Sequence, residues 1–146
     1  MTPADPAVLE RKLSVITDNL HILEPIAKLS VEQYRSDVFT RKGTERLLQE
    51  LIEAAIDINT HVLVQDGHSP PDDYHQGFLR LAEIGVLPAD LATALAPSAG
   101  LRNRLVHEYD AIVDALVLDG TRKAQSLFPP YVASIRAYLR RVTGTH

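Results

Sequence analysis

The sequence predicts an all-α fold, an antiparallel helical bundle that forms one domain over residues 1–146. Apolar residues recur every three or four positions over most of the chain, which is the spacing that gives a helix one buried face. No segment has the alternation of apolar and polar residues that is typical of strands. Clusters of Gly and Pro separate the helical segments and mark the turns between them.

The first helix is expected from about residue 5 to residue 29. Asp5 is a good N-cap, and Pro6 suits the first helical position because its missing N–H would have no partner there. The apolar residues form one stripe: Leu9, Leu13, Ile16, Leu20 and Leu23. Pro25 should kink or end this helix, since it removes a backbone donor and collides with the preceding turn.

A second long helix is expected from about residue 40 to residue 65. In the connector before it, Ser30 and Gln33 have the spacing of a capping box, in which each side chain binds the other residue's backbone N–H. The apolar stripe of the long helix consists of Leu47, Leu51, Ala55, Ile58 and Val62.

Residues 66–73 are dense in turn formers and break the helical pattern. Three histidines and two aspartates in and around this loop raise the question of a metal site: His61, His68, His75, Asp72 and Asp73. We expect no metal here, because the Pro-rich loop offers no recognised ligand spacing and a site needs ligands held in a fixed geometry. We interpret these residues as exposed loop polars.

The remaining helices are shorter or interrupted. A third helix is expected at about 73–84, ending at Gly85, and Pro88 then begins a fourth. Helical spacing resumes after residue 110 through Ile112, Val113, Leu116, Val117, Leu127, Val132, Ile135 and Leu139. Breaks at Asp119-Gly120 and Pro129-Pro130 predict one or two closing helices.

The composition favours a soluble cytoplasmic protein. A length of 146 residues is ample for one core. Without cysteine there is no disulfide framework, which fits a reducing compartment. The chain starts without a basic patch followed by an apolar run, and no segment approaches the ~20 apolar residues that span a bilayer.

The net charge of −4 is unusual for a protein that binds nucleic acid, but the charge is unevenly distributed. Between residues 48 and 98, Arg80 is the only basic residue beside eight acidic ones. Residues 99–146 hold seven basic and four acidic residues. The acidic middle suits a protein partner, and the basic last third suits an anion.

Chemically capable side chains concentrate in the stretch Leu101–Asp110, which reads Leu-Arg-Asn-Arg-Leu-Val-His-Glu-Tyr-Asp. Arg102 is a permanent cation whose planar fork matches phosphate oxygens, and His107 can take and give a proton near neutral pH. Together they suit cleavage of a phosphodiester, with His107 moving the proton and Arg102 stabilising the phosphoryl charge. Neither role requires a metal.

The spacing of Arg102 and His107 sets a geometric condition. Residues five apart on a helix point about 140° away from each other, whereas Asn103 and His107, four apart, share a face. Either the helix breaks between Arg102 and His107, or their pocket is completed by another helix or by a second copy of the chain. We favour a second copy in a two-fold homodimer. A bend at Pro97 and Gly100 would set the direction of Arg102.

Plainer interpretations stand beside these. A lone histidine on a helix is usually structural, and Arg104 with Glu108 is spaced as an ordinary surface pair. Glu53 and Asp57 share a helix face, either as a solvated or ion-paired edge or as groups that orient Arg102 or receive a proton near His107. A last group, Arg136, Arg140 and Arg141, is either a solvated face or a flank of an RNA groove.

The motif Arg102-Asn103-x-x-x-His107-x-Tyr109 resembles the Arg-x-x-x-x-His-x-Tyr motif of the HepT-like toxins, a branch of the HEPN superfamily. The similarity extends upstream. The segments Glu45–Gln49 and Ile52–Ile58 resemble the second helix of that family, and Gly77-Phe78 through Gly85-Val86 resembles the stretch before the motif.

The resemblance implies a HEPN-like helical homodimer that acts as a metal-independent ribonuclease without a cofactor. Arg102 and His107 would be catalytic, with Asn103 supporting them. It also implies a partner, an MntA-type minimal nucleotidyltransferase antitoxin, which would inactivate the toxin by transferring AMP to Tyr109. The added bulk and negative charge would block the place of an RNA phosphate. The RNA, a tRNA or an mRNA, stays open.

Two alternatives to a nuclease remain. The same dimer can be a catalytically inactive helical partner of a nucleotidyltransferase, contributing to its nucleotide or target site. It can also be a purely structural dimer in which Arg102 and His107 hold helices together.

Overall fold

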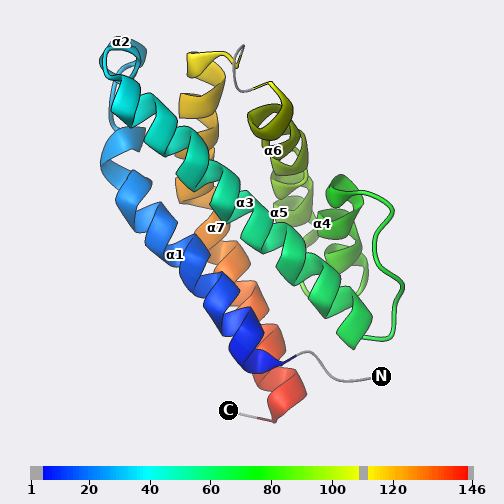
Figure 1. Cartoon of the computed structure of the whole chain (residues 1–146). Helices are drawn as coiled ribbons and strands as arrows, with labels where there is room; N and C mark the ends of the chain where they lie inside the picture. The colour runs from blue at the N-terminus through cyan, green and yellow to red at the C-terminus, as the bar shows by residue number, and fades with distance from the viewer. Residues whose placement is uncertain (1–4, 109–111, 145–146) are drawn as a thin grey trace.

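The fold is built from seven helices within residues 5–108 and 112–144, the part of the chain that the computed structural model describes. They are α1 (Pro6–Ala27), α2 (Val31–Arg35), α3 (Val38–Gln65), α4 (Tyr74–Glu83), α5 (Ala89–Leu95), α6 (Ser98–His107) and α7 (Asp114–Thr143) (Figure 1). No strand occurs in these ranges. The all-α prediction is confirmed.

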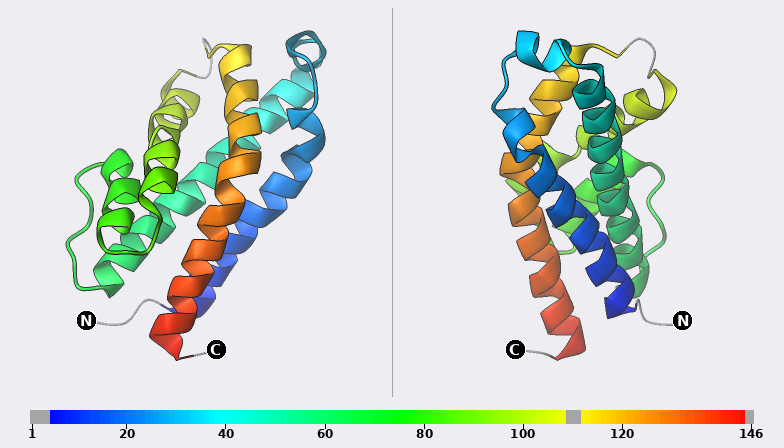
Figure 2. Two further views of the ribbon diagram at one scale, coloured as in Figure 1. Left: turned by 180° about the vertical axis from the view of Figure 1, so that it is seen from behind. Right: turned by 60° about the vertical axis from the view of Figure 1, so that its left-hand side comes forward.

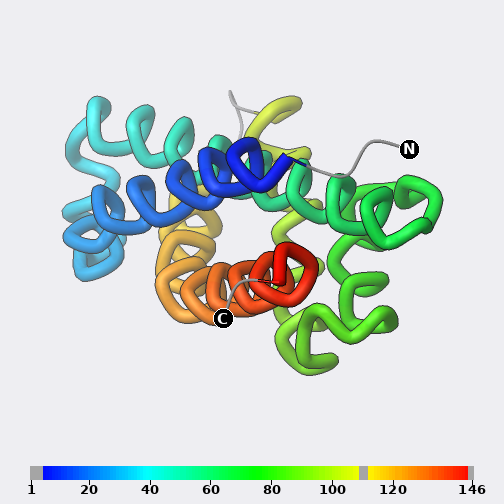
Figure 3. Tube along the Cα trace, turned by 90° about the horizontal axis from the view of Figure 1, so that it is seen from below, coloured from blue at the N-terminus to red at the C-terminus, as the bar shows by residue number. Residues whose placement is uncertain are grey.

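Three long helices, α1, α3 and α7, form the centre of the bundle. Helix α1 runs antiparallel to α3 and α7 and packs against both (Figures 1 and 2). The shorter helices α4, α5 and α6 cover α3 and α7 on the side away from α1, as the view along the bundle shows (Figure 3). Helix α6 packs on α3, and its C-terminus lies at the end of the molecule where α3 and α7 begin.

The local signals in the sequence position the first helices as expected. The Asp5 side chain accepts from the N–H of Ala7 and caps α1, whose apolar stripe is buried. Ser30 and Gln33 form the predicted capping box. Pro25 stays inside α1, which ends two residues later at Ala27.

The predicted breaks in the closing segment are wrong, because α7 is one helix through Gly120, Pro129 and Pro130. At Gly120, a Cβ would lie 2.5 Å from Cδ2 of Leu101. Glycine there leaves room for the Leu101 side chain of α6, so it serves packing and not a turn. The two prolines are exposed, and the buried face of α7 continues on both sides of them. Tertiary packing of that face outweighs the local preference for a break.

Tyr131 ties three helices together in the core. Its hydroxyl donates to Oδ1 of Asn59 on α3, at 2.6 Å, and lies 3.1 Å from the carbonyl oxygen of Ala55. Its ring makes edge-on contacts with Phe78 of α4 and Phe128 of α7, with centroids 6.0 and 5.8 Å apart. Burial raises the pKa of the Tyr131 hydroxyl well above its ordinary value, so the group stays a donor. These contacts fix α4 against α3, and both helices contribute to the site described below.

Within the described residues, none of the helices is at once long and apolar enough to cross a membrane.

Candidate active site

Helix α6 carries both Arg102 and His107 without a break, which excludes the first of the alternatives, a helix that breaks between them. The helix begins at Ser98 after the short Ala96-Pro97 connection that separates it from α5, and Gly100 lies inside it. The bend therefore precedes the motif by one turn. On an unbroken helix the two side chains leave in directions about 140° apart.

Arg102 is held by side chains from three helices. Its Nη2 donates to Oε2 of Glu53 on α3, at 3.2 Å, and its Nη1 donates to Oδ1 of Asn103, also at 3.2 Å. The guanidinium carbon lies 5.3 Å from the ring centroid of Tyr74, the first residue of α4. Glu53 in turn accepts from Nε2 of Gln49 at 2.9 Å. These contacts hold the Arg102 guanidinium in place before any ligand binds.

The structure separates the two carboxylates that share a face of α3. Glu53 contacts Arg102, as an ion-paired edge and an orienting role would both require, so its orienting role stays a prediction. Asp57 pairs instead with Lys12 of α1, at 3.0 Å. One of the two acidic residues thus belongs to the site and the other to the edge of the bundle.

Arg102 keeps donors for a ligand. A guanidinium carries five N–H donors. Two are used on Glu53 and Asn103, which leaves one N–H on each Nη atom. The Nε–H is buried and has no partner among the described residues, so it does not count as a donor for a ligand. The side chain is 19% exposed, so it is sheltered but reaches the surface. Such a group can bind a phosphate oxygen in a partly desolvated setting, where its charge acts more strongly than in water.

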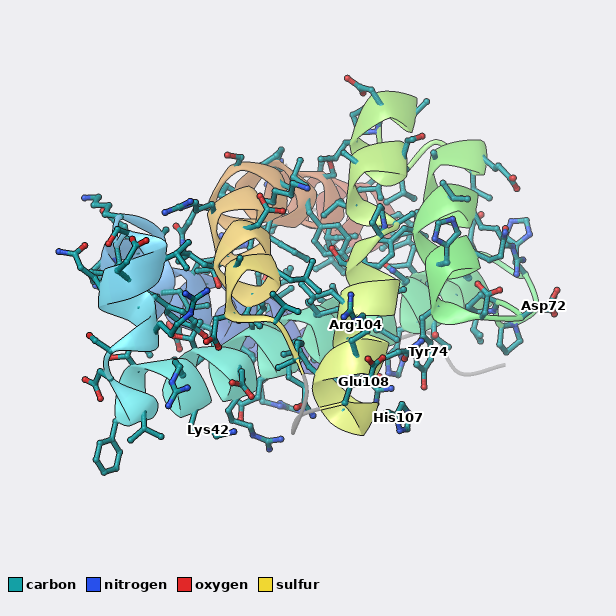
Figure 4. The ribbon with its side chains drawn as sticks, turned by 90° about the horizontal axis from the view of Figure 1, so that it is seen from above. Lys42, Asp72, Tyr74, Arg104, His107 and Glu108 are labelled. Atoms are coloured by element: carbon teal, nitrogen blue, oxygen red, sulfur yellow. The ribbon has the colours of Figure 1, made fainter. Side chains whose placement is uncertain are left out.

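His107 is the last residue of α6 and is exposed. Figure 4 shows its ring directed away from the bundle, with Tyr74 beside the same helix. Among the described residues, no side chain hydrogen-bonds the imidazole. Asn103, one turn earlier, lies on the same face of α6 as His107 and accepts a hydrogen bond from Arg102. An exposed imidazole can exchange protons with a substrate and with water.

The other charged residues singled out in the sequence lie outside this arrangement. Arg104 and Glu108 form the expected surface pair at 3.7 Å. Arg136 pairs with Glu10 at 3.7 Å, and Arg140 and Arg141 are exposed in the C-terminal part of α7. That part of α7 lies at the end of the molecule opposite to the C-terminus of α6 (Figure 1). The solvated face is therefore the better interpretation of these arginines.

Two further predictions concern polar residues elsewhere. Tyr109, the residue implied to be modified, lies outside the described residues, as does Asp110. In the loop between α3 and α4, Nε2 of His68 lies 3.2 Å from Oδ2 of Asp66, and Asp73 caps α4 by accepting from the N–H of Gln76. No group of three potential metal ligands gathers in the described part of the chain.

The sequence interpretation missed Tyr74 and Gln49. Tyr74 had no signal in the pattern, because it follows a Pro-rich loop and its contact with Arg102 depends on how α4 lies beside α6. Gln49 had one: it lies four residues before Glu53 on α3, the spacing at which two side chains of one helix meet.

A cleft also lies beside α6. An apolar cleft of about 810 Å³ opens between α3, α5, α6 and α7 and includes Leu48, Leu101 and Leu127 in its lining, with Arg104 and Lys123 among its polar residues. Arg102 and His107 do not line it.

The sequence model described as "Ribonuclease HepT-like" matches residues 16–135, which is most of the chain. The chain belongs to the HepT-like ribonuclease family. A relative from Aphanizomenon flos-aquae, a tRNA nuclease HepT, is 38% identical over 139 residues, and the match covers 95% of each chain. The resemblance seen in the motif is thus confirmed, and ribonuclease is the class of this HepT-like enzyme.

Solved structures share the HepT-like fold. A tri-AMPylated HEPN toxin from Shewanella oneidensis in complex with MNT antitoxin has a TM-score of 0.78 at 23% identity, covering 89% of this chain and 97% of that one. The cytosolic protein YutE of unknown function from Bacillus subtilis has a TM-score of 0.86 at 17% identity, covering 99% and 96%. At these identities the likeness concerns the fold of the helices.

Proposed function

We propose that this HepT-like ribonuclease is the toxin of a toxin–antitoxin pair and cleaves RNA without a metal ion, using Arg102 and His107. One observation carries the proposal. In a chain of this family, a single helix carries a partly exposed, oriented guanidinium with one unused N–H on each Nη atom, and an exposed imidazole. These are the two groups that metal-free phosphodiester cleavage needs.

The chemistry follows from the two groups. The imidazole of His107 accepts the proton of a ribose 2′-hydroxyl, and the 2′-oxygen attacks the adjacent phosphorus. The bond from phosphorus to the 5′-oxygen breaks, and this leaving oxygen takes a proton from water. Arg102 stabilises the extra negative charge on the phosphorane, and Asn103 helps to position the guanidinium. The products are a 2′,3′-cyclic phosphate, which water can open to a 3′-phosphate, and a 5′-hydroxyl.

In the proposed two-fold homodimer, a guanidinium and an imidazole can meet at one phosphate, which the two groups of a single helix α6 do not do. Arg102 and His107 of one copy point in different directions on α6. In the proposed dimer, Arg102 of one copy and His107 of the other face the same phosphate, which gives two equal sites. The tRNA and mRNA nucleases of the family make RNA the substrate class we propose for this chain.

We further propose that a minimal nucleotidyltransferase of the MntA type is the antitoxin and transfers AMP from ATP to Tyr109. The complexes of similar fold, a HEPN toxin with MNT antitoxin among them, support this partner. Tyr109 follows His107 by two residues in the sequence. An AMP group so close to the imidazole would compete with the substrate phosphate through charge and bulk.

The decisive experiment is cleavage of total RNA by the purified protein with and without EDTA. We expect cleavage in EDTA and a loss of roughly a hundredfold or more in His107→Ala, because that variant has no proton acceptor. His75→Ala, an exposed histidine of α4, serves as the matched control and should cleave normally. Cleavage abolished by EDTA, or full activity in His107→Ala, would contradict the proposal.

The modification has its own test. After incubation with the partner nucleotidyltransferase and ATP, intact-mass spectrometry should show additions of AMP mass on the wild type and none on Tyr109→Phe. Tyr74→Phe removes the other tyrosine hydroxyl near α6 and should still be modified. Additions that persist in Tyr109→Phe would refute the assignment.

One observation favours the alternative of a catalytically inactive helical partner of a nucleotidyltransferase. The carboxylate of Glu53 already pairs with the Arg102 guanidinium, as it would if Arg102 only joined α6 to α3 and took no part in catalysis. On that alternative the protein binds the nucleotidyltransferase but leaves RNA intact under all conditions, with wild type and His107→Ala indistinguishable.

A further inference from the structure

Tyr74 has no role in the proposed reaction, yet its ring lies on the guanidinium of Arg102. We propose that Tyr74 and Arg102 together form a binding platform for one nucleobase of a single-stranded RNA, beside the phosphate that Arg102 contacts. This inference rests on the proposed function, because it takes RNA as the ligand.

The contact leaves ring surface available. The guanidinium carbon is 5.3 Å from the ring centroid, within the range of a cation–π interaction. Tyr74 is nevertheless 43% exposed and ranks among the large apolar side chains that reach solvent. An aromatic ring that lies against a cation and is partly exposed offers a flat, apolar surface next to a group that can bind phosphate.

The backbone that carries Tyr74 is fixed. Asp73 caps α4 through the N–H of Gln76, at 2.7 Å. One turn after Tyr74, Gly77 lies so close to α3 that a Cβ would be 3.4 Å from Cβ of Asn59. The next residue, Phe78, is buried against Tyr131. The ring is therefore presented by an anchored helix and not by the preceding loop, so stacking on it requires no ordering of the backbone.

The charge of the molecule argues for stacking as a source of affinity. Attraction to phosphates normally dominates RNA binding, but this chain has a net charge of −4, and Arg102 already shares its charge with Glu53. Stacking of bases on aromatic side chains depends little on sequence and does not need net positive charge. Loss of one such contact weakens binding by roughly tenfold or more.

A competing explanation is that Tyr74 only shields Arg102 from water and holds it in place. The two explanations differ in what happens when the base is removed from the RNA. If the ring stacks on a base, removing either the ring or the base costs affinity, but removing both costs little more than removing one. If the ring only positions Arg102, the effects of the two changes are independent.

The test measures binding of a fluorescein-labelled 2′-O-methyl oligonucleotide, which lacks the 2′-hydroxyl and resists cleavage. A series with one abasic site moved along the strand is compared on wild type, Tyr74→Phe, Tyr74→Trp and Tyr74→Leu. Phe39→Leu is the matched control, because Phe39 is 86% exposed at the start of α3 and outside the site. Thermal melting of each variant verifies folding.

We expect one abasic position to weaken binding to wild type, Tyr74→Phe and Tyr74→Trp by roughly tenfold. Tyr74→Leu should bind the intact strand about as weakly and lose nothing more at that position, while Phe39→Leu behaves as wild type. Equal affinity of Tyr74→Leu and wild type for the intact strand would overturn the platform, as would an abasic effect that persists undiminished in Tyr74→Leu. Binding is measured without cleavage, so this experiment tests the platform even if the protein cuts no RNA.

Cleavage kinetics of the same variants give a second test of whether the Tyr74 ring stacks on a base or only positions Arg102. A stacking ring makes Tyr74→Leu raise KM for short RNA with a smaller change in kcat, and Tyr74→Phe restores KM. A fall in kcat alone in Tyr74→Leu, with KM unchanged, would assign the ring to positioning only and overturn the platform.

Discussion

Arg102 has its partners before a substrate arrives. The guanidinium donates to Glu53 and to Asn103, Glu53 also accepts from Gln49, and the ring of Tyr74 lies against the guanidinium. Donors that are already oriented stabilise developing charge without reorganising during the reaction. The same pairing lowers the net charge that a phosphate meets, so Glu53 has opposite effects on substrate binding and on the chemical step.

Replacing Glu53 separates these effects. In Glu53→Ala the guanidinium loses its fixed orientation. We expect kcat to fall roughly tenfold, which is less than the roughly hundredfold loss that a 1 Å misplacement of a catalytic group can cause. KM should stay equal or fall, because a negative charge next to the phosphate has been removed. Steady-state cleavage of a short RNA measures both constants. Asp57→Ala, on the same face of α3 but paired with Lys12, is the control and should change neither. A higher KM with unchanged kcat in Glu53→Ala would contradict the orienting role.

At the scale of elements, the corner where α3 and α7 begin contains a carboxylate, that of Glu45, whose surroundings disfavour its ionised form. Glu45 lies on the second turn of α3, and burial raises the pKa of its carboxyl above the ordinary value, an effect that Asp114 of α7 reinforces. Lys42, 3.9 Å away, and Arg41 act in the opposite direction but do not outweigh the burial. The ionised carboxylate is thus less favourable in the folded state than in the unfolded chain.

The sign of the pH dependence follows. A folded-state pKa above the unfolded one means that the native protein binds the proton more tightly, so stability falls as pH rises through the folded pKa. Glu45→Gln should therefore melt a few degrees higher than wild type at pH 7, with the difference vanishing near pH 4, where both states are protonated. Melting curves at the two pH values measure it, and exposed Glu83→Gln should show no difference. A lower melting temperature of Glu45→Gln at pH 7 would refute this account.

The elements also mark what sequence reasoning can reach. Helix starts were predictable because their signals are local: Asp5 caps α1, and Ser30 with Gln33 caps α2. Gly120 and Pro129 were misread because the same residue types serve turns and helix interiors, and only the neighbouring helix decides between them.

The site divides in the same way. Residue chemistry and the motif singled out Arg102 and His107, whereas the shared helix face of Glu53 and Asp57 left open which of the two meets Arg102. Tyr74 could not be predicted from the sequence, because its contact with Arg102 depends on the packing of α4 beside α6 and not on the spacing of residues along one helix.

At the scale of the whole molecule, the question is which copy of the chain supplies each group. Arg102 is enclosed by α3 and α4 of its own chain, whereas His107 projects from the end of α6 (Figure 4). Neither group lines the apolar cleft beside α6. We therefore expect a phosphate on Arg102 to be reached by the imidazole of a second copy and not by the imidazole of the same helix.

Heterodimers with defined composition test this division. We expect a homodimer of twice the 16.1 kDa chain mass by light scattering, and differently tagged chains allow mixed dimers to be purified. If each site takes Arg102 from one copy and His107 from the other, pairing Arg102→Ala with His107→Ala leaves one intact site and about half of wild-type cleavage. Pairing wild type with the double variant leaves none. If both groups act within one copy, the results reverse: the first dimer is inactive and the second retains about half. Activity of the second dimer alone would therefore exclude a shared site, and a monomer in solution would exclude the dimer itself.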